Sequence, residues 1–337
     1  MKLIVFGAGA WGTALAIHAA QKHSVALWAR NPQDAARLET DRCNHKYLPN
    51  RSFPEPMVIF DDIGDTIEWG GTDALWVSGT SVAGLRDLAT LLSNHTTLNR
   101  NKPAGFLWLC KGVEQGSQLL PHEVVGQAWP ALRNAGALSG PSFADEVAAG
   151  LPCALTVATQ SDALIQLATQ AFHHTQMRIY GSSDMIGVAL GGALKNVIAI
   201  ATGVCDGLEL GLNARAALIT RGLAEIARLG NAMGAQPETF MGLAGLGDLV
   251  LTCTGNLSRN RKVGLALAQG QSLAQVLASL GHVAEGVACA SAAAVLAAER
   301  GVEMPILTAV NAVINGQLDA RSAIAALVSR KPKAEVQ

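Results

Sequence analysis

The sequence predicts an α/β protein in which a doubly wound parallel sheet is followed by an all-α domain. Three observations predict this fold class. Apolar, β-rich runs alternate with helical patterns through the first half, a glycine-rich turn follows the first run, and Ala- and Leu-rich helical segments fill the second half. Alternating strands and helices are typical of a parallel sheet that carries helices on both faces.

The elements of the first half follow in order from this alternation. Strands are expected at residues 2–6, 24–29, 73–77, 105–110 and 154–158, with a last one near 177–180. Helices are expected between them at residues 13–22, 32–43, 82–93 and 119–129.

The pattern changes after Gly181-Ser182-Ser183-Asp184, whose polar side chains are typical of a helix start. Beyond this point strand signals almost disappear. Helices are expected at residues 185–205, 214–233, 261–269, 285–300 and 306–315. We therefore place a boundary near residue 183, between a first domain of residues 1–183 and a second of residues 184–330.

Composition and charge exclude several kinds of protein. The chain has 337 residues, enough for two domains, and half of them are apolar, which provides material for a core and excludes a disordered protein. The net charge of −1 provides no broad basic surface, so we expect no nucleic-acid partner.

The apolar stretches and the cysteines indicate the compartment. The uncharged runs on either side of Lys195 are shorter than the ~18 to 20 apolar residues that span a bilayer, and the N-terminal residues lack a signal-peptide pattern. We therefore expect a cytoplasmic protein without a membrane span. The six cysteines lie far apart and without metal-ligand spacing, so reduced thiols and no metal site are expected.

A glycine motif predicts a dinucleotide site. Gly7-Ala8-Gly9-Ala10-Trp11-Gly12 matches GxGxxG directly between the first expected strand and helix. In such a turn Gly7 permits the tight bend, Gly9 lets the backbone approach a pyrophosphate, and Gly12 lets helix and strand pack closely. The phosphates bind at the helix N-terminus. The alternative is a simple tight turn, but the position between strand and helix favours a Rossmann-type cofactor site.

The end of the second expected strand indicates which dinucleotide binds. A site for NAD(H) places a carboxylate there to bind the ribose 2′-hydroxyl. This chain has Ala29-Arg30-Asn31 instead, and a cation suits a 2′-phosphate. We therefore expect NADP(H), with NAD(H) as the second possibility; an ordinary solvated arginine is the alternative interpretation of Arg30.

A single lysine stands out in the apolar second half. Between Met185 and Cys205 the only charged residue is Lys195, and Gly191 and Gly192 lie one turn before it, leaving room for a ligand. Burial lowers the pKa of an ammonium toward the range useful for proton transfer. The alternative is a lysine whose long side chain carries its charge to solvent.

Three further positions are candidate site residues. Lys111 follows an apolar strand, where a cation would face a cofactor cleft, or it is a solvated loop lysine. Asn256-Leu257-Ser258-Arg259-Asn260-Arg261-Lys262 opens an expected helix with hydrogen-bond donors and three cations, as a phosphate site requires, or it is a capped surface helix with a basic face. Asp248 either orients a lysine or caps a helix.

Taken together, these residues resemble the NAD(P)-dependent glycerol-3-phosphate dehydrogenases of the bacterial type. The resemblance runs from residue 2 to about residue 330. It rests on Gly7 to Gly12 with Trp11, Asn44-His45-Lys46-Tyr47-Leu48-Pro49, Cys110-Lys111-Gly112, Gly140-Pro141-Ser142-Phe143-Ala144, Gly191-Gly192-Ala193-Leu194-Lys195-Asn196, Asn213-Ala214-Arg215, Arg221-Gly222, Gly245-Leu246-Gly247-Asp248, Ser258-Arg259-Asn260-Arg261 and Glu285-Gly286.

The resemblance implies a Rossmann domain before a helical substrate domain, a homodimer, and reversible reduction of dihydroxyacetone phosphate to sn-glycerol 3-phosphate for glycerophospholipid synthesis. It implies that Lys195 is the general acid or base. It places substrate contacts at Lys111, Gly140, Ser142, Lys195, Asn196, Asp248, Ser258, Arg259 and Asn260. It places cofactor contacts at Ala10, Trp11, Arg30, Lys111, Ala144, Arg259, Val283 and Glu285.

The chain departs from this family at one turn. The family usually has a Val-Pro-Ser-like turn after the third expected strand, and this chain has Ser78-Gly79-Thr80-Ser81. Since proline fixes φ and glycine widens its range, we expect a looser backbone beside the cofactor.

Two rival functions remain open on sequence grounds. A related two-domain β-hydroxyacid or phosphosugar dehydrogenase would share the glycine motif and a helical-domain lysine, but an acid substrate would not need the Ser258-Arg259-Asn260 cradle in this form. A non-catalytic NADP-binding redox sensor would leave Lys195 unexplained.

Overall fold

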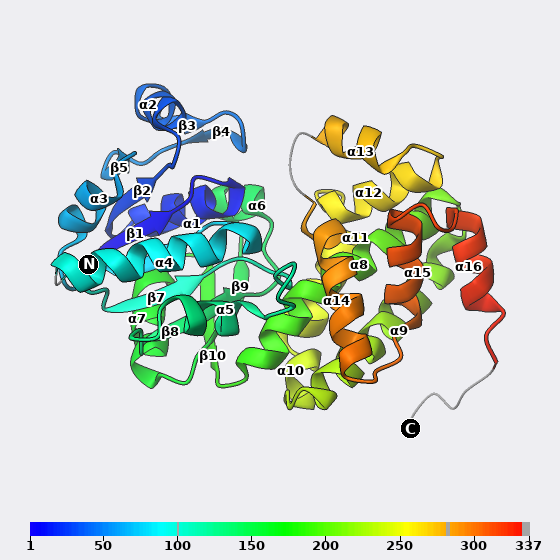
Figure 1. The fold of residues 1–337 in the computed structure, drawn as a ribbon. Coiled ribbons are helices and arrows are strands. Elements are labelled where there is room, and N and C mark those ends of the chain that lie inside the picture. The colour runs from blue at the N-terminus through cyan, green and yellow to red at the C-terminus, as the bar shows by residue number, and fades with distance from the viewer. Residues whose placement is uncertain (100, 281–283, 332–337) are drawn as a thin grey trace.

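An eight-stranded sheet occupies the first half of the chain, and helices form the second half (Figure 1). The computed structural model describes residues 1–99, 101–280 and 284–331. The strands are β1 (Lys2–Phe6), β2 (Ser24–Trp28), β3 (Cys43–Asn44), β4 (Leu48–Ser52), β5 (Met57–Phe60), β6 (Leu75–Ser78), β7 (Gly105–Trp108), β8 (Ala135–Ser139), β9 (Cys153–Ala158) and β10 (Met177–Ser182). In the sheet half the helices are α1 (Ala10–Ala20), α2 (Pro32–Asp41), α3 (Ile63–Gly70), α4 (Val82–Asn99), α5 (Pro121–Ala128), α6 (Ala144–Ala148) and α7 (Asp162–Phe172).

Two residues separate the first helix of the helical half from β10. Its elements are α8 (Met185–Gly207), α9 (Gly211–Ala232), α10 (Pro237–Met241), the π-helix η1 (Leu243–Gly247), α11 (Asp248–Thr254), α12 (Arg259–Ala268), α13 (Leu273–Leu280), α14 (Glu285–Glu299), α15 (Pro305–Ile314) and α16 (Ala320–Val328).

The strand order creates a crevice where the chain reverses direction across the sheet. The main sheet has the order β10-β9-β8-β7-β6-β1-β2-β5. The chain therefore moves outward from β1 in one direction, then returns to β6 on the other side of β1. In open α/β sheets ligands bind at the carboxyl ends of strands beside such a reversal. The turns that follow β1 and β6 therefore define the expected cofactor position.

The sheet is not parallel throughout, which corrects the sequence-based expectation for its last two strands. β9 pairs antiparallel with β8, and β10 runs parallel to β9. The reason lies in the connection from β8 to β9. Its helix α6 has 5 residues, about 7 Å of helix at 1.5 Å per residue. This is too short to return the chain along a strand of about 16 Å, so β9 starts at the edge where β8 ends. Helix α7, with 11 residues, is long enough for a parallel return.

Several short elements were not predicted from the sequence. β8 reads Ala-Gly-Ala-Leu-Ser, whose small residues have weak strand propensity. β5 has only 4 residues, and the β3–β4 hairpin lies outside the main sheet. The predicted helix over 13–22 begins at Ala10, so Gly12 lies inside it.

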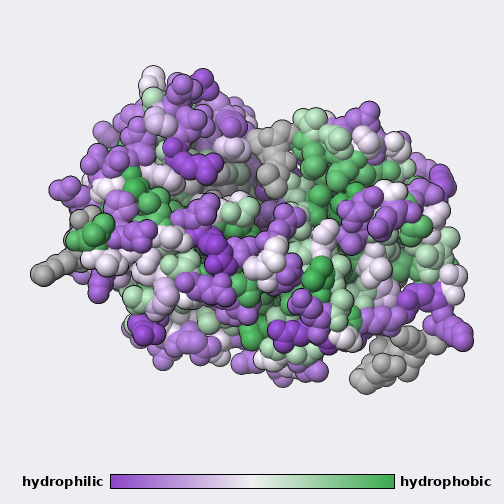
Figure 2. Space-filling view, in the orientation of Figure 1, coloured by the Kyte–Doolittle hydropathy of each residue, from purple (hydrophilic) through white to green (hydrophobic). Residues whose placement is uncertain are grey.

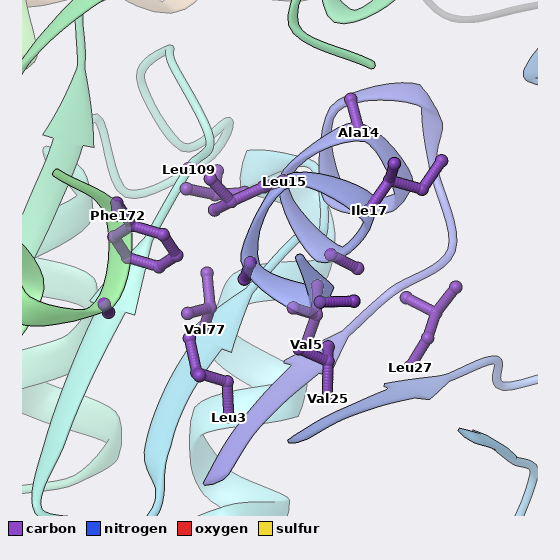
Figure 3. Close-up of a cluster of buried hydrophobic side chains, with 14 of the residues drawn as sticks. Leu3, Val5, Ala14, Leu15, Ile17, Val25, Leu27, Val77, Leu109 and Phe172 are labelled. Carbon is purple, nitrogen blue, oxygen red and sulfur yellow. The ribbon is translucent and has the colours of Figure 1, made fainter. Parts of the chain in front are cut away.

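The core of the sheet half forms between α1 and the strands beneath it. Leu3, Val5, Val25, Leu27 and Val77 point from β1, β2 and β6 toward Ala14, Leu15 and Ile17 of α1 (Figure 3). Buried parallel strands are apolar on both faces, which is why β1 and β2 read as nearly continuous apolar runs. This packing fixes the start of α1 against the end of β1.

Helix α8 is the central helix of the second half. It is long and apolar enough to cross a membrane, and 94% of its most apolar window is buried inside the protein. The uncharged runs on either side of Lys195 are each too short to span a bilayer, but Lys195 does not interrupt the helix. Our expectation that no helix is long and apolar enough to span was therefore wrong. α8 packs against α9, α11, α12 and α14, so its apolar residues belong to the core of the helical half.

Candidate active site

A cleft of about 1080 Å³ brings the two halves of the protein together around the expected site residues. The glycine turn contributes Gly9, Ala10 and Trp11, and the segment after β7 contributes Lys111. From the helical half, Lys195, Asn196, Asp248 and residues 258–260 line the same cleft.

The surface beside the cleft differs between the halves. Apolar residues gather on the helical half near α13 and α14, whereas polar residues predominate over the sheet half (Figure 2). Leu273, Leu277 and Val287 form part of the apolar wall of the cleft.

The glycine turn has the geometry that a dinucleotide turn requires. Gly7 has φ +118°, in the region that favours glycine. A Cβ on Gly12 would lie 2.3 Å from the carbonyl oxygen of Gly7, so glycine is needed for α1 to start this close to β1. Gly9 caps α1 without a side-chain hydrogen bond. The amide groups of the first turn are therefore not occupied by a capping side chain.

Gly79 makes contacts in the turn after β6 that a proline could not make. Its N–H donates to the carbonyl oxygen of Phe6 at 2.8 Å, a bond that proline could not make. A Cβ at this position would lie 2.8 Å from the carbonyl oxygen of Gly7. Gly79 therefore permits a close approach between the turn after β6 and the glycine turn.

Arg30 lies next to the glycine turn but does not line the cleft. It follows β2, whose Trp28 carbonyl accepts a hydrogen bond from the Gly7 N–H at 2.9 Å. The Arg30 side chain is exposed. It stands at the carboxyl edge of the sheet, next to Asn31, which caps α2.

A buried cluster of two lysines and one carboxylate spans the halves. Lys111 Nζ lies 2.6 Å from Asp248 Oδ2, and Lys195 Nζ lies 2.6 Å from Asp248 Oδ1. Lys195 is 7% exposed and Asp248 is 1% exposed. The alternative that Lys195 extends its charge to solvent is therefore wrong. Asp248 is the first residue of α11 and Gly247 is its cap, so Asp248 pairs with lysines and is not the cap.

Burial and charge set the protonation of this cluster. Burial lowers the pKa of Lys195 to about 8, although the Asp248 carboxylate acts in the opposite direction. For Asp248, burial alone would raise the pKa, but the two ammonium groups outweigh it and hold the pKa below its usual value. Asp248 is therefore ionised at neutral pH, and Lys195 changes its protonation state near pH 8.

The two glycines before Lys195 do not leave an open groove for a ligand. A Cβ on Gly191 would lie 2.6 Å from the carbonyl oxygen of Ala244 in η1, and one on Gly192 would lie 3.3 Å from Lys111 Cγ. These glycines let η1 and the Lys111 side chain approach α8. They bring Asp248 and Lys111 within reach of Lys195.

Sequence reasoning missed Thr252, which also contacts the cluster. Lys195 Nζ donates to Thr252 Oγ1 at 2.8 Å, and this hydroxyl donates to the carbonyl oxygen of Asp248 at 2.6 Å. The signal was present, because residues four apart share one face of a helix. Thr252 fixes the direction from which Lys195 approaches Asp248.

The start of α12 lines the cleft, but not all of its predicted cations face it. Ser258 caps the helix by accepting from the Arg261 N–H at 3.2 Å. Arg261 itself pairs with Asp206, with Nη2 2.7 Å from Oδ2, so it does not join the anion site. Arg259 is exposed and lines the cleft.

Two buried amides connect α8, α12 and α14. Asn260 Nδ2 donates to Asn196 Oδ1 at 2.9 Å, and Asn260 Oδ1 accepts from the Gly286 N–H at 3.0 Å. Asn196 and Asn260 are thus held in fixed orientations at the cleft wall.

The remaining predicted residues that the structure describes lie in the cleft or beside it. Ser142, Ala144 and Glu285 line it. The Gly140 carbonyl oxygen accepts from Lys111 Nζ at 3.2 Å and from Ser142 Oγ at 3.1 Å. Burial raises the pKa of Glu285, and the charge of Arg259 partly offsets that effect. Val283 lies outside the described residues.

The fold and the cleft define a two-domain dehydrogenase that uses a nicotinamide dinucleotide, since a dinucleotide turn and a buried lysine of lowered pKa share one cavity. Comparison with family models identifies the family within this class of dehydrogenases. Residues 2–165 match the N-terminal model of NAD-dependent glycerol-3-phosphate dehydrogenase, and residues 184–325 match the C-terminal one. The chain belongs to this family.

Individual relatives agree over the whole chain. Glycerol-3-phosphate dehydrogenase [NAD(P)+] of Janthinobacterium sp. (strain Marseille) is 52% identical and covers 100% of both chains. The protein of that name from Cupriavidus necator is 54% identical over 99% of this chain and 100% of its own. The crystal structure of glycerol-3-phosphate dehydrogenase from Coxiella burnetii matches with a TM-score of 0.91 at 39% identity, covering 98% of this chain and 99% of that one.

Proposed function

We propose that the protein catalyses reversible hydride transfer between dihydroxyacetone phosphate and sn-glycerol 3-phosphate, with NADP(H) favoured over NAD(H). The observation that carries this proposal is the Lys111–Asp248–Lys195 cluster, which lies in the same cleft as the glycine turn. The names of the relatives support the same reaction. The product would supply glycerophospholipid synthesis.

The residues at the glycine turn fit a dinucleotide. The first turn of α1 has no capping side chain, and its amides and helix dipole favour a pyrophosphate. Ala10 and Trp11 would border the cofactor, as would Ala144 and Glu285 across the cleft. A bound nicotinamide cofactor supplies the hydride that reduces the carbonyl carbon.

The opposite wall fits a small phosphorylated ketone. Arg259, with the amides at the start of α12 and the side chains of Ser258 and Asn260, would bind the phosphate. Binding the phosphate orients the remote carbonyl, which lowers the entropic part of the barrier. Gly140, Ser142 and Asn196 would complete the contacts around the substrate.

Lys195 would act as the general acid in reduction. Its ammonium and that of Lys111 polarise the carbonyl oxygen, and Lys195 then gives a proton to the forming alkoxide. In the reverse direction neutral Lys195 accepts the hydroxyl proton. Asp248 stabilises the charged form of Lys195 and holds both lysines in place.

The pH dependence should differ in sign between the two directions. Reduction needs protonated Lys195, whose pKa is about 8. We expect kcat/KM for dihydroxyacetone phosphate to be level below that pH and to fall about tenfold for each further pH unit. For sn-glycerol 3-phosphate, kcat/KM should rise about tenfold for each pH unit below that pKa and level off above it, because neutral Lys195 is then the base. Initial rates in both directions between pH 6 and 10 test this, and parallel profiles would contradict the assignment.

Arg30 should control the choice of coenzyme. Since its cation suits a 2′-phosphate, Arg30→Ala should lower kcat/KM with NADPH by about tenfold and change kcat/KM with NADH less than twofold. Arg37→Ala, at another exposed position on the following helix, serves as the matched control. A wild-type protein with a clear preference for NADH would rule out this role of Arg30.

The function itself is tested by the absorbance of NADPH at its nicotinamide band after dihydroxyacetone phosphate is added. The proposal predicts stoichiometric decay. A panel with β-hydroxyacids and other phosphosugars separates the related dehydrogenases, and absence of oxidation with every ketone, despite tight NADPH binding, would favour the redox sensor.

The organisation of the protein is part of the proposal. Residues 1–183 would bind the cofactor and residues 184–330 the substrate phosphate. We further propose that the protein is a cytoplasmic homodimer. We also propose that it has no membrane span, because the apolar helix α8 is enclosed by its neighbours. Size-exclusion chromatography with light scattering tests the dimer.

A further inference from the structure

The hairpin formed by β3 and β4 belongs to the sequence motif Asn44 to Pro49, to which no role has been given so far. The hairpin connects α2 to β5 and lies outside the main sheet (Figure 1). Leu48 is fully buried in the core beneath it. Tyr47, near its tip, lines the cofactor cleft together with Ala10 and Trp11.

Both polar atoms of the Asn44 side chain form hydrogen bonds, and its Nδ2 joins this hairpin to the glycine turn and to α1. Asn44 Nδ2 donates to the carbonyl oxygen of Ala8 at 2.9 Å and to Thr13 Oγ1 at 2.8 Å. Asn44 Oδ1 accepts from the Tyr47 N–H at 3.2 Å. The residue is 3% exposed, and Thr13 is fully buried. A buried side-chain amide with both donors and its acceptor engaged has one orientation.

The three partners belong to three segments that contribute residues to the cleft. Ala8 belongs to the glycine turn, Thr13 to the first turns of α1, and Tyr47 to the hairpin. We propose that Asn44 is a positioning residue for the coenzyme: it holds the glycine turn, the start of α1 and Tyr47 in one arrangement without touching the coenzyme itself. The inference rests on the proposed function for the location of the coenzyme.

This role requires an amide at position 44. A carboxylate would direct an acceptor at the Ala8 carbonyl and lose both donors. Leucine keeps the volume but removes three hydrogen bonds, of which the one to Thr13 is buried. Because the contacts lie at the pyrophosphate turn and not at the ribose, loss of Asn44 should affect NADPH and NADH equally. That distinguishes Asn44 from Arg30, whose loss changes their ratio.

The test compares coenzyme binding by isothermal titration with NADPH and NADH alone. Asn44→Leu should raise both dissociation constants about tenfold or more and leave their ratio within twofold of wild type, since the three hydrogen bonds of Asn44 are lost. At saturating NADPH, kcat and the KM for dihydroxyacetone phosphate should stay within about twofold. His45→Leu places the same side chain at the adjacent exposed position and should change neither constant.

A purely structural role would lower the melting temperature and leave the dissociation constants of the folded protein unchanged, which would overturn the inference. If Asn44→Leu does not fold, Thr13→Val decides the matter. It removes one hydrogen bond without loss of volume and should raise the dissociation constants of NADPH and NADH about threefold. Unchanged dissociation constants would overturn the proposal. The titrations contain no ketone, so they stand even if the protein fails to reduce dihydroxyacetone phosphate, which would refute the proposed function instead.

Discussion

Lys195→Met should lower kcat for dihydroxyacetone phosphate by about two to four powers of ten, the usual contribution of a positioned acid or base. Methionine keeps most of the volume of the buried side chain, and Asp248 retains Lys111 as a partner, so the fold should be preserved. The dissociation constant for NADPH should change less than threefold. Steady-state rates and coenzyme titration measure the two effects separately.

The matched control is Lys22→Met, which removes an exposed lysine at the end of α1. It should have wild-type rates. Near-normal turnover of Lys195→Met would refute the assignment of Lys195 as the acid, and equal loss of coenzyme binding and turnover would point to a disturbed cleft.

Asp248→Asn should have the second large effect, on both activity and stability. Without the carboxylate, two ammonium groups face each other in a buried site. The favourable charge that raises the pKa of Lys195 is lost, so the lysine becomes neutral at lower pH. We expect reduction at pH 7.5 to slow by about two powers of ten or more and the free energy of unfolding to fall by about 3 kcal/mol.

The pH profile provides the decisive measurement for this variant. The alkaline limb of the reduction profile should move to lower pH, with partial recovery of the rate toward pH 6. Denaturant unfolding gives the change in stability, and Asp73→Asn, at an exposed position before β6, is the control. An alkaline limb that stays near pH 8 would show that Asp248 does not set the protonation of Lys195.

The features that sequence predicts well are those with a local cause. The glycine turn can be predicted because a tight bend and a close approach of helix to strand each need glycine at a fixed position. Gly7 makes the bend, and Gly12 permits the close approach. Lys195 can be predicted as a site residue because a single cation on an apolar helix must either be buried with a partner or reach solvent. Both predictions use only neighbouring residues.

The features that sequence could not predict depend on residues far apart in the chain. Asp248 lies 53 positions after Lys195, and the packing of η1 and α11 against α8 brings the two together. The direction of β9 follows from the length of α6, an element that the sequence did not distinguish from a turn. Arg259 and Arg261 had the same appearance in sequence, yet Arg259 lines the cleft whereas Arg261 pairs with Asp206.

The Lys111–Asp248 contact also bears on how the two halves move. Lys111 belongs to the sheet half and Asp248 to the helical half, so a hinge opening that widens the cleft must stretch their 2.6 Å ion pair. Stretching it would leave Asp248 with a single partner, which is costly for a buried carboxylate. The charges that serve proton transfer would therefore also hold the two halves in their closed arrangement.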